Sequence, residues 1–346
     1  MTRNSFPLNT GRLFFLRIFH AGDPRMNAKV DVLQNLAKEA MRDGSISPQA
    51  LQALIEKIKQ TRVHILLVGA TGAGKSSTIN ALFNTQHAKV GTGTDPETKE
   101  ITQYELDNIT LWDTPGLGES PDADKRHISN LRAKINEKDV KNNLLIDLVL
   151  LIVDGSNRDM SSTFTLLEEV IIPGLGKEKD RLLVAINQAD LAMKGKHWDH
   201  QLNQPQEPLI RFLEDKVGSI KKRILESKGI SINPIYYSAG NLDDNGTQKP
   251  YNLAKLMTFI LEHVKTKKRL VFLHDINDKK ENFESNDNTN YGEKIETIFT
   301  DSWLKNISDF LAETAKTAAG VIKEVVTSPA VTNALTKALL KLIKLK

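Results

Sequence analysis

Residues 63–76 read Val-His-Ile-Leu-Leu-Val-Gly-Ala-Thr-Gly-Ala-Gly-Lys-Ser, an apolar run followed by a glycine-rich segment. The apolar run is typical of a buried strand in a parallel sheet. Gly69 and Gly74 stand five positions apart and precede Lys75 and Ser76, which is the spacing of a phosphate-binding loop between a strand and a helix. Such glycines let backbone N–H groups surround a phosphate, and the amino end of the following helix adds positive potential. The stretch predicts an α/β fold with a phosphate site.

Short apolar runs alternate with helical segments on both sides of this stretch, a pattern typical of βαβ units and a mostly parallel sheet. The predicted strands are residues 63–68, 101–106, 109–112, 148–153, 182–186 and 232–237. The predicted helices are residues 75–84, 123–140, 161–172, 206–228 and 251–267. The junction between Leu106 and Ile109 indicates a tight hairpin, so we expect one antiparallel pair of strands at the edge.

Polarity and periodicity divide the chain into five segments. Residues 1–25 are predicted to be a disordered extension and not a signal peptide, because Arg17 interrupts their apolar run and no small-residue cleavage site follows. An amphipathic anchor is the alternative interpretation. Met26 is then a candidate for the true start. The remaining segments are N-terminal helices at 26–60, the α/β domain at 61–267, a polar linker at 268–294 and amphipathic C-terminal helices at 295–346.

Composition excludes several kinds of site. The chain has 346 residues, a formal net charge of +4 and no cysteine, so disulfides, thiolate zinc sites, iron–sulfur clusters and thiol nucleophiles are ruled out. The positive charge lies at the two ends, since residues 1–25 hold four Arg and one Asp, and residues 329–346 hold four Lys and no acid. The part between them is slightly acidic, so we find no direct nucleic-acid signature.

Residues 113–116 read Asp-Thr-Pro-Gly at the end of a predicted strand. A carboxylate at this position can hold Mg²⁺ through water, and the N–H of Gly116 can reach a γ-phosphate. In the phosphate loop, Lys75 would bridge the β- and γ-phosphates, and the hydroxyl of Ser76 would ligate the Mg²⁺. The metal candidates from these residues are Ser76 and Asp113, and Lys75 and Gly116 are catalytic candidates.

Residues 187–190 read Asn-Gln-Ala-Asp and follow the predicted strand at 182–186. Guanine presents N1–H and an exocyclic amine side by side, and one carboxylate accepts both, whereas adenine has an acceptor at N1. Asp190 would therefore select guanine, because an unpaired buried partner is costly, and Asn187 could bond the other edge of the base. A helix amino cap is the alternative interpretation. Residues 238–240, Ser-Ala-Gly, form a turn whose N–H could reach guanine O6.

Together these motifs resemble the P-loop GTPases of the translation-factor-related class, within it the Era and TrmE group, over about residues 60–267. Residues 72–83 are also similar to the phosphate loops of septins and interferon-inducible GTPases. The resemblance implies an α/β fold, a three-layer GTPase (G) domain with a mostly parallel central sheet, plus N-terminal and C-terminal helical segments. It also implies a cytoplasmic switch that binds GTP and GDP with Mg²⁺ and hydrolyses GTP slowly. The alternatives are a GTP-dependent assembling or membrane-associated scaffold, and a ribosome-associated factor.

The resemblance also assigns individual residues. Thr98 falls where the first switch loop places its Mg²⁺-ligating threonine, which adds it to the metal and catalytic candidates, and Thr94 is the rival position. The expected nucleotide-binding residues are Gly69, Gly72, Ala73, Gly74, Lys75, Ser76, Ser77, Asn187, Gln188, Asp190, Ser238 and Ala239.

Three positions depart from the family pattern. Gln188 replaces the lysine whose stem packs on the base, so we expect reduced affinity. Leu117 stands where many GTPases have a glutamine that orients the attacking water, so hydrolysis should be slow unless self-association or an activating protein partner supplies the missing group. Glu119 is a local substitute or an exposed loop carboxylate. Gly72 replaces the asparagine of potassium-recruiting relatives, which makes potassium activation doubtful.

The last segment forms a basic amphipathic helix. Val331, Leu335 and Leu342 share one face, and the lysines lie elsewhere. Such a helix packs on the protein or on a second copy, or it contacts a partner or a membrane surface as a peripheral anchor through residues 329–346. Residues 268–346 contain no Gly-x-x-Gly loop in a β-rich context, which argues against the RNA-binding domain that Era uses.

Overall fold

A computed structural model of the protein describes residues 48–83, 89–91, 101–115, 121–240, 248–277, 279–284, 287 and 289–317. Contacts within the chain define two compact units, one of Met1–Gln52 with Glu324–Lys346 and one of Ala53–Lys323. Apart from residues 48–52, the residues described below belong to the second unit. The predictions for residues 1–47 and 318–346 lie outside the described residues, and so do those for Thr94, Thr98, Gly116, Leu117 and Glu119.

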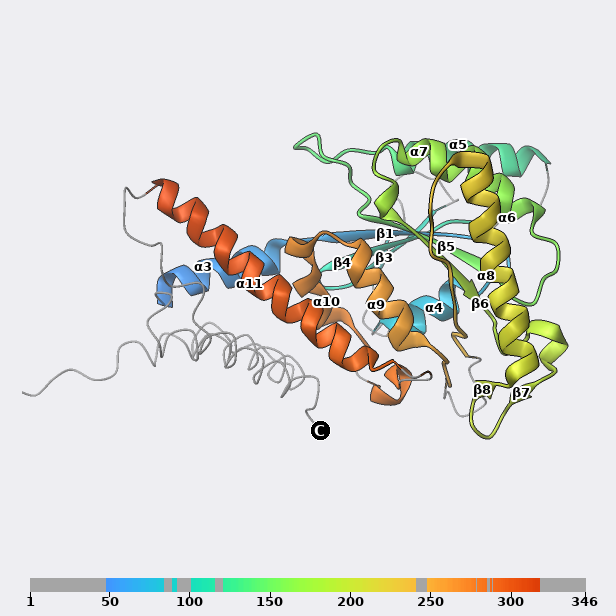
Figure 1. The fold of residues 1–346 in the computed structure, drawn as a ribbon. Coiled ribbons are helices and arrows are strands. Elements are labelled where there is room, and N and C mark those ends of the chain that lie inside the picture. Colours follow the sequence, from blue (N-terminus) through green and yellow to red (C-terminus); the bar gives the residue numbers. More distant parts are fainter. Residues whose placement is uncertain are drawn as a thin grey trace, which may run out of the picture. The chain divides into compact units, whose positions relative to one another are not determined.

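Seven strands of the described residues form one sheet in the order β2–β3–β4–β1–β5–β6–β9 (Figure 1). They are β1 (Val63–Val68), β2 (Lys89–Gly91), β3 (Thr102–Glu105), β4 (Ile109–Asp113), β5 (Leu148–Asp154), β6 (Leu182–Asn187) and β9 (Ile235–Tyr236). From β4 to β9 neighbouring strands are parallel, whereas β3 is antiparallel to β4 and β2. The predicted hairpin is confirmed, with Leu106 N–H donating to Ile109 O at 2.9 Å.

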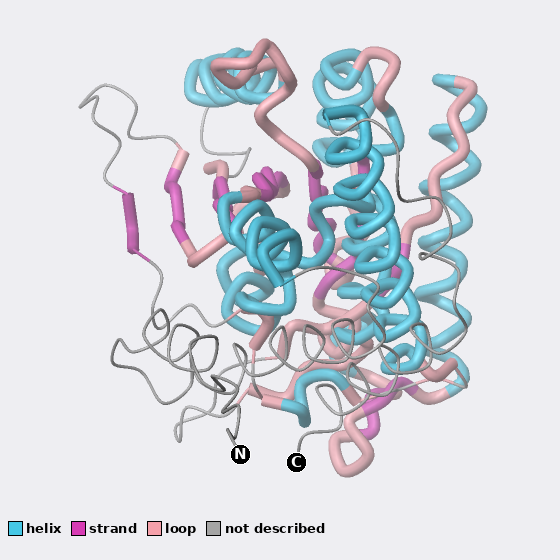
Figure 2. The backbone as a smooth tube through the Cα atoms, turned by 90° about the vertical axis from the view of Figure 1, so that its left-hand side faces the viewer, coloured by secondary structure: helices cyan, strands magenta, loops and turns pink. Residues whose placement is uncertain are grey.

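Helices cover both faces of the sheet, which gives three layers (Figures 1 and 2). One face carries α5 (Pro121–Ile135), α6 (Ser161–Thr165), α7 (Ile172–Leu175) and α8 (Glu207–Lys228). The other face carries α4 (Lys75–Leu82), α9 (Leu253–His263), α10 (Phe272–Asp275) and α11 (Tyr291–Thr317). The helix α3 (Pro48–Gln60) precedes β1. In the part of the chain that the structure describes, no helix is both long enough and apolar enough to cross a bilayer.

The central strands are continuous apolar runs because both of their faces are buried. In β5 the six residues 148–153 are at most 2% exposed. One large apolar cluster joins β1, β5 and β6 to α5, to the segment 164–175 and to α8. Within 161–175, where one helix is predicted over 161–172, α6 passes through a π-helical turn (Leu166–Ile171) into α7. The expected α/β fold with a mostly parallel central sheet is therefore confirmed.

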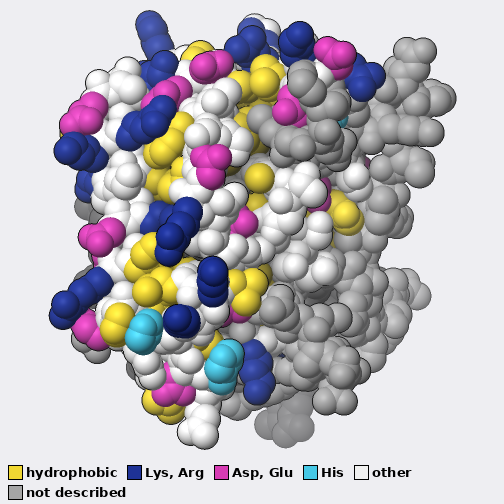
Figure 3. Space-filling view, turned by 90° about the vertical axis from the view of Figure 1, so that its right-hand side faces the viewer, with side chains coloured by type: hydrophobic (Ala, Val, Ile, Leu, Met, Phe, Trp, Pro, Cys, Tyr) yellow, Lys and Arg dark blue, Asp and Glu magenta, His cyan; other side chains and the backbone are white. Residues whose placement is uncertain are grey.

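The outer surface of α8 is polar. Figure 3 shows Lys and Arg, Asp and Glu, and scattered apolar side chains interspersed on the face of the molecule that carries this helix. Arg211 contacts Glu207 one turn away at 2.9 Å, and Arg223 contacts Glu168 at 2.9 Å. Pairs of opposite charge spaced along an exposed helix are typical of a surface in contact with water, and each stabilises the fold only slightly.

The segment 268–294 differs from the solvated linker that its polar composition predicts. It contains a 3₁₀ turn (Thr266–Val271), α10 and a second 3₁₀ turn (Lys280–Phe283). Asp275 and Asn282 are only 4% and 3% exposed. Their polar groups can be buried because they bond the backbone of distant elements, an arrangement that composition does not reveal.

Asn277 and Asn282 of this segment close the carboxyl end of α4. Asn277 N–H donates to Leu82 O at 2.9 Å, and its side-chain amide donates to Asn80 O and Ala81 O at 3.2 Å. The Asn282 amide donates to Ala81 O at 3.3 Å. The last carbonyl groups of a helix have no partner within the helix, so residues about 200 positions later supply the cap of α4.

Candidate nucleotide-binding site

The phosphate loop joins β1 to α4, as the sequence predicts. The Lys75 ammonium donates to Gly69 O at 3.1 Å and to Ala70 O at 3.2 Å, which folds the loop around the side chain. Burial lowers the pKa of Lys75, and the nearby Asp113 carboxylate opposes that shift. The lysine thus lies at the first turn of α4, where backbone N–H groups also add positive potential.

Two glycines give the loop its shape. Gly72 and Gly74 have φ of +80° and +85°, a left-handed conformation that side chains with a Cβ rarely adopt. A Cβ on Gly74 would also collide with the Asn187 amide, whereas a Cβ on Gly72 would meet nothing within 4 Å. Gly74 therefore allows the segment 187–190 to approach the phosphate loop closely.

Asp113 ends β4 beside the amino end of α4. Its Oδ2 accepts a hydrogen bond from Ser76 Oγ at 3.2 Å, and its buried Oδ1 accepts none from any residue that the structure describes. Burial raises the pKa of Asp113, while Lys75 and the Ser76 hydroxyl oppose the shift. A carboxylate and a hydroxyl are the hard oxygen ligands that Mg²⁺ prefers. The unpaired oxygen beside Ser76 therefore fits a magnesium site.

Asn187 ends β6 and joins two predicted motifs. Its Nδ2 donates to Ala73 O at 2.9 Å, and its Oδ1 accepts from Ala239 N–H at 2.9 Å. Asp190 Oδ1 accepts from Ser238 Oγ at 2.6 Å. The alternative role as a helix cap is not observed, because the short 3₁₀ turn that follows (Ala192–Gly195) has no side-chain cap. The structure thus brings residues 187–190 and 238–240 together with the phosphate loop.

Gln188 stands where the family pattern has lysine. Its backbone is left-handed, with φ of +60°, and its Nε2 donates to Gly72 O at 2.7 Å. Its Oε1 accepts from Ser156 Oγ at 3.4 Å, from the loop after β5. The amide therefore holds the middle of the phosphate loop against β5 and β6.

An open cavity of about 420 Å³ lies along the phosphate loop. Its lining joins the loop and α4 to β4 and the segment after β6: Thr71, Gly72, Gly74, Lys75, Ser76, Ser77, Asp113, Thr114, Pro115 and Gln188. The volume is in the range of small-molecule sites. Seven of the predicted nucleotide-binding or metal residues line this one cavity.

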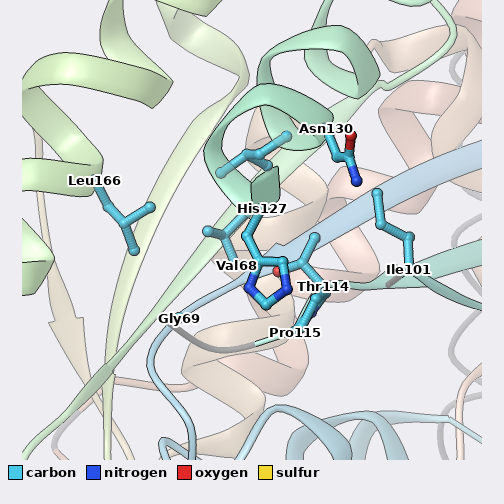
Figure 4. A pocket seen from close by; sticks show the side chains of 9 residues that line it. Val68, Gly69, Ile101, Thr114, Pro115, His127, Asn130 and Leu166 are labelled. Carbon is cyan, nitrogen blue, oxygen red and sulfur yellow. The ribbon is translucent and has the colours of Figure 1, made fainter. Parts of the chain in front are cut away.

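A second cavity, which shares Thr114 and Pro115 with the first, is shown in Figure 4. His127 of α5 points into it beside Thr114 and Pro115, and Ile101 and Leu166 close it. Its volume of about 10 Å³ admits no more than a single water molecule. Among the described residues it therefore holds no space for a ligand larger than water.

Comparison with known proteins identifies the domain. The sequence profile of a family described as "50S ribosome-binding GTPase" matches residues 64–188, from β1 to the residue after β6. These residues form a P-loop GTPase domain. The match includes the phosphate loop, residues 113–116 and the first half of the segment 187–190.

Curated relatives match parts of the chain. The mouse (Mus musculus) T-cell-specific guanine nucleotide triphosphate-binding protein 2 is 25% identical over 228 residues, which are 64% of this chain and 49% of that protein. The rat (Rattus norvegicus) interferon-inducible GTPase 5 is 38% identical over 90 residues, 23% of this chain and 19% of that one. The chain thus spans about half the length of the first of these relatives.

Among solved structures, the G domain of the FeoB iron transporter of T. maritima is 22% identical and covers 58% of this chain and 98% of its own, with a TM-score of 0.31.

Three residues that hold the segments of the candidate site together were missed by sequence reasoning. Gln248 is buried and its amide bonds three backbone carbonyls beside residues 238–240. Tyr237 OH lies 2.6 Å from Thr78 Oγ1 and links β9 to α4. Thr114 Oγ1 donates to Leu67 O at 2.8 Å and fixes the turn after β4. No motif marks Gln248 or Tyr237, and the motif at 113–116 does not reveal the role of Thr114, because each acts through a contact with another segment of the chain.

Proposed function

We propose that the chain binds GTP and GDP in the open cavity, hydrolyses GTP slowly to GDP and phosphate, and acts as a conformational switch. The observation that supports this most directly is Asn187, which bonds Ala73 O of the phosphate loop and the N–H of Ala239. One buried side chain thus holds a phosphate-binding segment and a base-reading segment together. Both lie at the carboxyl ends of parallel strands, where α/β sheets bind their ligands.

The phosphate side of the proposal assigns roles to residues of the loop and of β4. Lys75 and the loop N–H groups bind the β- and γ-phosphates, and Gly116 offers its N–H to the γ-phosphate. Ser76 and Thr98 would hold Mg²⁺, with Asp113 acting through water. The ion would neutralise the charge that develops on the phosphates. The unpaired Asp113 Oδ1 beside Ser76 supports this assignment.

The base side rests on Asp190. Its carboxylate would accept N1–H and the exocyclic amine of guanine, and adenine cannot supply this pair of donors. Ser238 Oγ holds one carboxylate oxygen at 2.6 Å, which orients the group. Ser238 and Ala239 form the turn whose N–H groups would face guanine O6. Gln188 holds the phosphate loop through its hydrogen bond to Gly72 O.

Slow hydrolysis is proposed because Leu117 stands where a glutamine would orient water. An apolar side chain cannot polarise water, so the rate should be near the ~10⁻⁴ to 10⁻² s⁻¹ of unassisted switches. The missing group would come from an activating protein or from a second copy of the chain.

A second candidate function is GTP-dependent assembly or scaffolding. Leu117 favours assembly. Because the chain lacks its own water-orienting side chain, its GTPase activity would rise when a second copy supplies one. The curated relatives include proteins named interferon-inducible GTPases, whose phosphate loops residues 72–83 resemble. GTPase activity per molecule that rises with protein concentration would favour assembly, and a constant value would favour an independent switch.

Finer placement is also proposed. The segments 113–116 and 187–190 support the Era and TrmE group within the P-loop GTPases. We place the protein in the cytoplasm. The basic amphipathic pattern of residues 329–346 supports a peripheral contact of that segment with a membrane. Binding of the full chain to anionic vesicles, compared with neutral ones, tests the membrane contact.

The sharpest test of the nucleotide assignment is Asp190→Asn. Wild type should bind GDP at least about 100-fold more tightly than ADP, because the carboxylate pairs with donors that adenine lacks. The asparagine amide should reverse the preference toward xanthosine diphosphate, whose C2 carbonyl accepts where guanine donates. Asp215→Asn, an exposed change on α8, is the matched control and should leave binding unchanged. Equal affinity of wild type for ADP and GDP would overturn the assignment.

A further inference from the structure

Gln248 occupies an unusual position at the base side of the site. The residue is buried, and its Nε2 donates to Ala239 O at 2.6 Å, to Ser77 O at 3.1 Å and to Gly240 O at 3.2 Å. Two of these carbonyls belong to the turn 238–240, and the third belongs to α4. One amide group therefore joins the turn to the helix that begins at the phosphate loop.

The chemistry of the position requires a donor. Three carbonyl oxygens converge on one nitrogen, and a carbonyl oxygen only accepts hydrogen bonds. A side-chain amide supplies two N–H groups without a charge, so one of them is shared between two carbonyls. A buried apolar side chain would leave carbonyl groups unpaired, and a carboxylate would repel them.

The backbone around Gln248 holds it in register with the turn. Ser238 and Tyr251 exchange two backbone hydrogen bonds, at 3.0 Å and 2.8 Å. Gly240 has φ of +73°, and a Cβ there would lie 2.5 Å from Lys249 O. The turn 238–240 therefore packs directly against residues 248–251, and Gln248 is fixed at their junction with α4.

The turn that Gln248 holds controls the orientation of two proposed base-reading residues. Ser238 Oγ bonds the Asp190 carboxylate at 2.6 Å, and Ala239 N–H bonds Asn187 Oδ1 at 2.9 Å. A shift of the turn would move both hydrogen bonds at once, while the contacts of Lys75 with its own loop would stay in place.

We propose that Gln248 is a positioning residue for guanine selection. It fixes the turn 238–240 at a constant distance from α4. Asp190 and Asn187, which bond this turn, are then placed to contact the base of a nucleotide whose phosphates are held by the phosphate loop. This inference rests on the proposed guanine-nucleotide function. It assigns selectivity to a residue that does not contact the nucleotide.

The test compares Gln248→Met with wild type in competition binding of GDP and ADP. Methionine fills a similar volume without a donor, so the turn is released. The GDP affinity should fall about tenfold, and the ADP affinity, which reports the phosphate loop, should change less than twofold. Thr258→Val is the matched control, since it removes a buried side-chain hydrogen bond to Ala254 O within α9 without freeing the carbonyls of the turn. This variant should lower the melting temperature and keep the ratio of GDP to ADP affinity.

An equal loss of GDP and ADP affinity, or an unchanged ratio in Gln248→Met, would overturn the inference. If that variant does not fold, Gln248→Asn makes the same comparison, because its amide is one methylene shorter and cannot reach all three carbonyls. A wild type that binds ADP as tightly as GDP overturns the proposed function and this inference together. A guanine-selective wild type with an unchanged ratio in the variant overturns only the inference.

Discussion

Lys268 Nζ lies 2.7 Å from Asp147 Oδ2, an ion pair that joins the 3₁₀ turn after α9 to the residue before β5. The Asp147 side chain is only 5% exposed, and the same oxygen accepts the His64 N–H at 3.0 Å. This pair lies at the amino ends of β1 and β5, at the opposite edge of the sheet from the proposed nucleotide site. It therefore offers a way to change the stability of the fold without touching the site.

Lys268→Met should destabilise the protein by about 2 kcal/mol, because it leaves a buried carboxylate without its cation. Urea unfolding measures the difference. The double variant Asp147→Asn/Lys268→Met should recover most of the loss, since no uncompensated charge remains. Equal stability of Lys268→Met and wild type would show that the backbone N–H of His64 alone satisfies Asp147.

Asp275 should make stability depend on pH. Burial raises the pKa of this carboxyl from near 3.8 to about 6, although it accepts the Asn108 N–H at 2.9 Å. The folded state therefore binds a proton more tightly than the unfolded state, so its contribution to stability is greatest below pH 4 and is lost as the pH rises through about 6. Relative to Asp275→Asn, wild type should lose ~2 kcal/mol between pH 4 and pH 7.

Urea unfolding of both proteins across this range measures the slope that belongs to Asp275. Parallel pH profiles for wild type and Asp275→Asn would mean that the carboxyl has the same pKa in the folded and the unfolded chain.

The two left-handed glycines of the phosphate loop should respond differently to alanine. Gly72→Ala should cost about 1 kcal/mol, which is the penalty of a Cβ in this conformation. Gly74→Ala should cost about 3 kcal/mol, because its Cβ also displaces the Asn187 amide and leaves buried groups unpaired. Chemical denaturation compares the two variants, and equal losses would contradict the close packing of Asn187 on Gly74.

Trp303 anchors α11 in the core. The side chain is fully buried, and its Nε1 has no hydrogen-bond partner among the described residues. Trp303→Ala should cost about 3–5 kcal/mol through the cavity it leaves. Trp303→Phe should cost only about 1 kcal/mol. The phenylalanine ring fills most of the cavity, and the loss of an unpaired buried donor offsets part of the lost packing. Thermal unfolding gives the order of the two variants, and a phenylalanine as harmful as alanine would point to a hidden partner for the indole.

Local sequence patterns predicted much of the fold. The apolar runs at 63–68, 148–153 and 182–186 form β1, β5 and β6 within one residue of the expected ends, because buried parallel strands require such runs. The phosphate loop, Asp113 and Gln188 line one cavity, and Asn187 bonds the loop beside it, since the carboxyl ends of parallel strands share an edge of the sheet. These features follow from spacing along the chain.

Other features depend on contacts that no local pattern marks. The edge strand β2 has three residues and little apolar character, so it does not differ from a loop in the sequence. Asp275 and Asn282 are polar residues in a polar segment, yet both are buried by backbone partners. Gln248 lies eight residues after the segment 238–240 and acts only through its hydrogen bonds to that turn and to α4. Such residues are found when the fold brings their partners together.

The cap that Asn277 and Asn282 place on α4 has a consequence for how the protein is made. The helix has eight residues and begins at the phosphate loop, but the groups that complete its last turn come about 200 residues later. A chain emerging during synthesis therefore carries its phosphate loop long before that helix can close. A fragment that ends after α9 would keep every signature motif but lack the groups that cap α4, so we expect it to unfold more readily than a fragment that extends past residue 282.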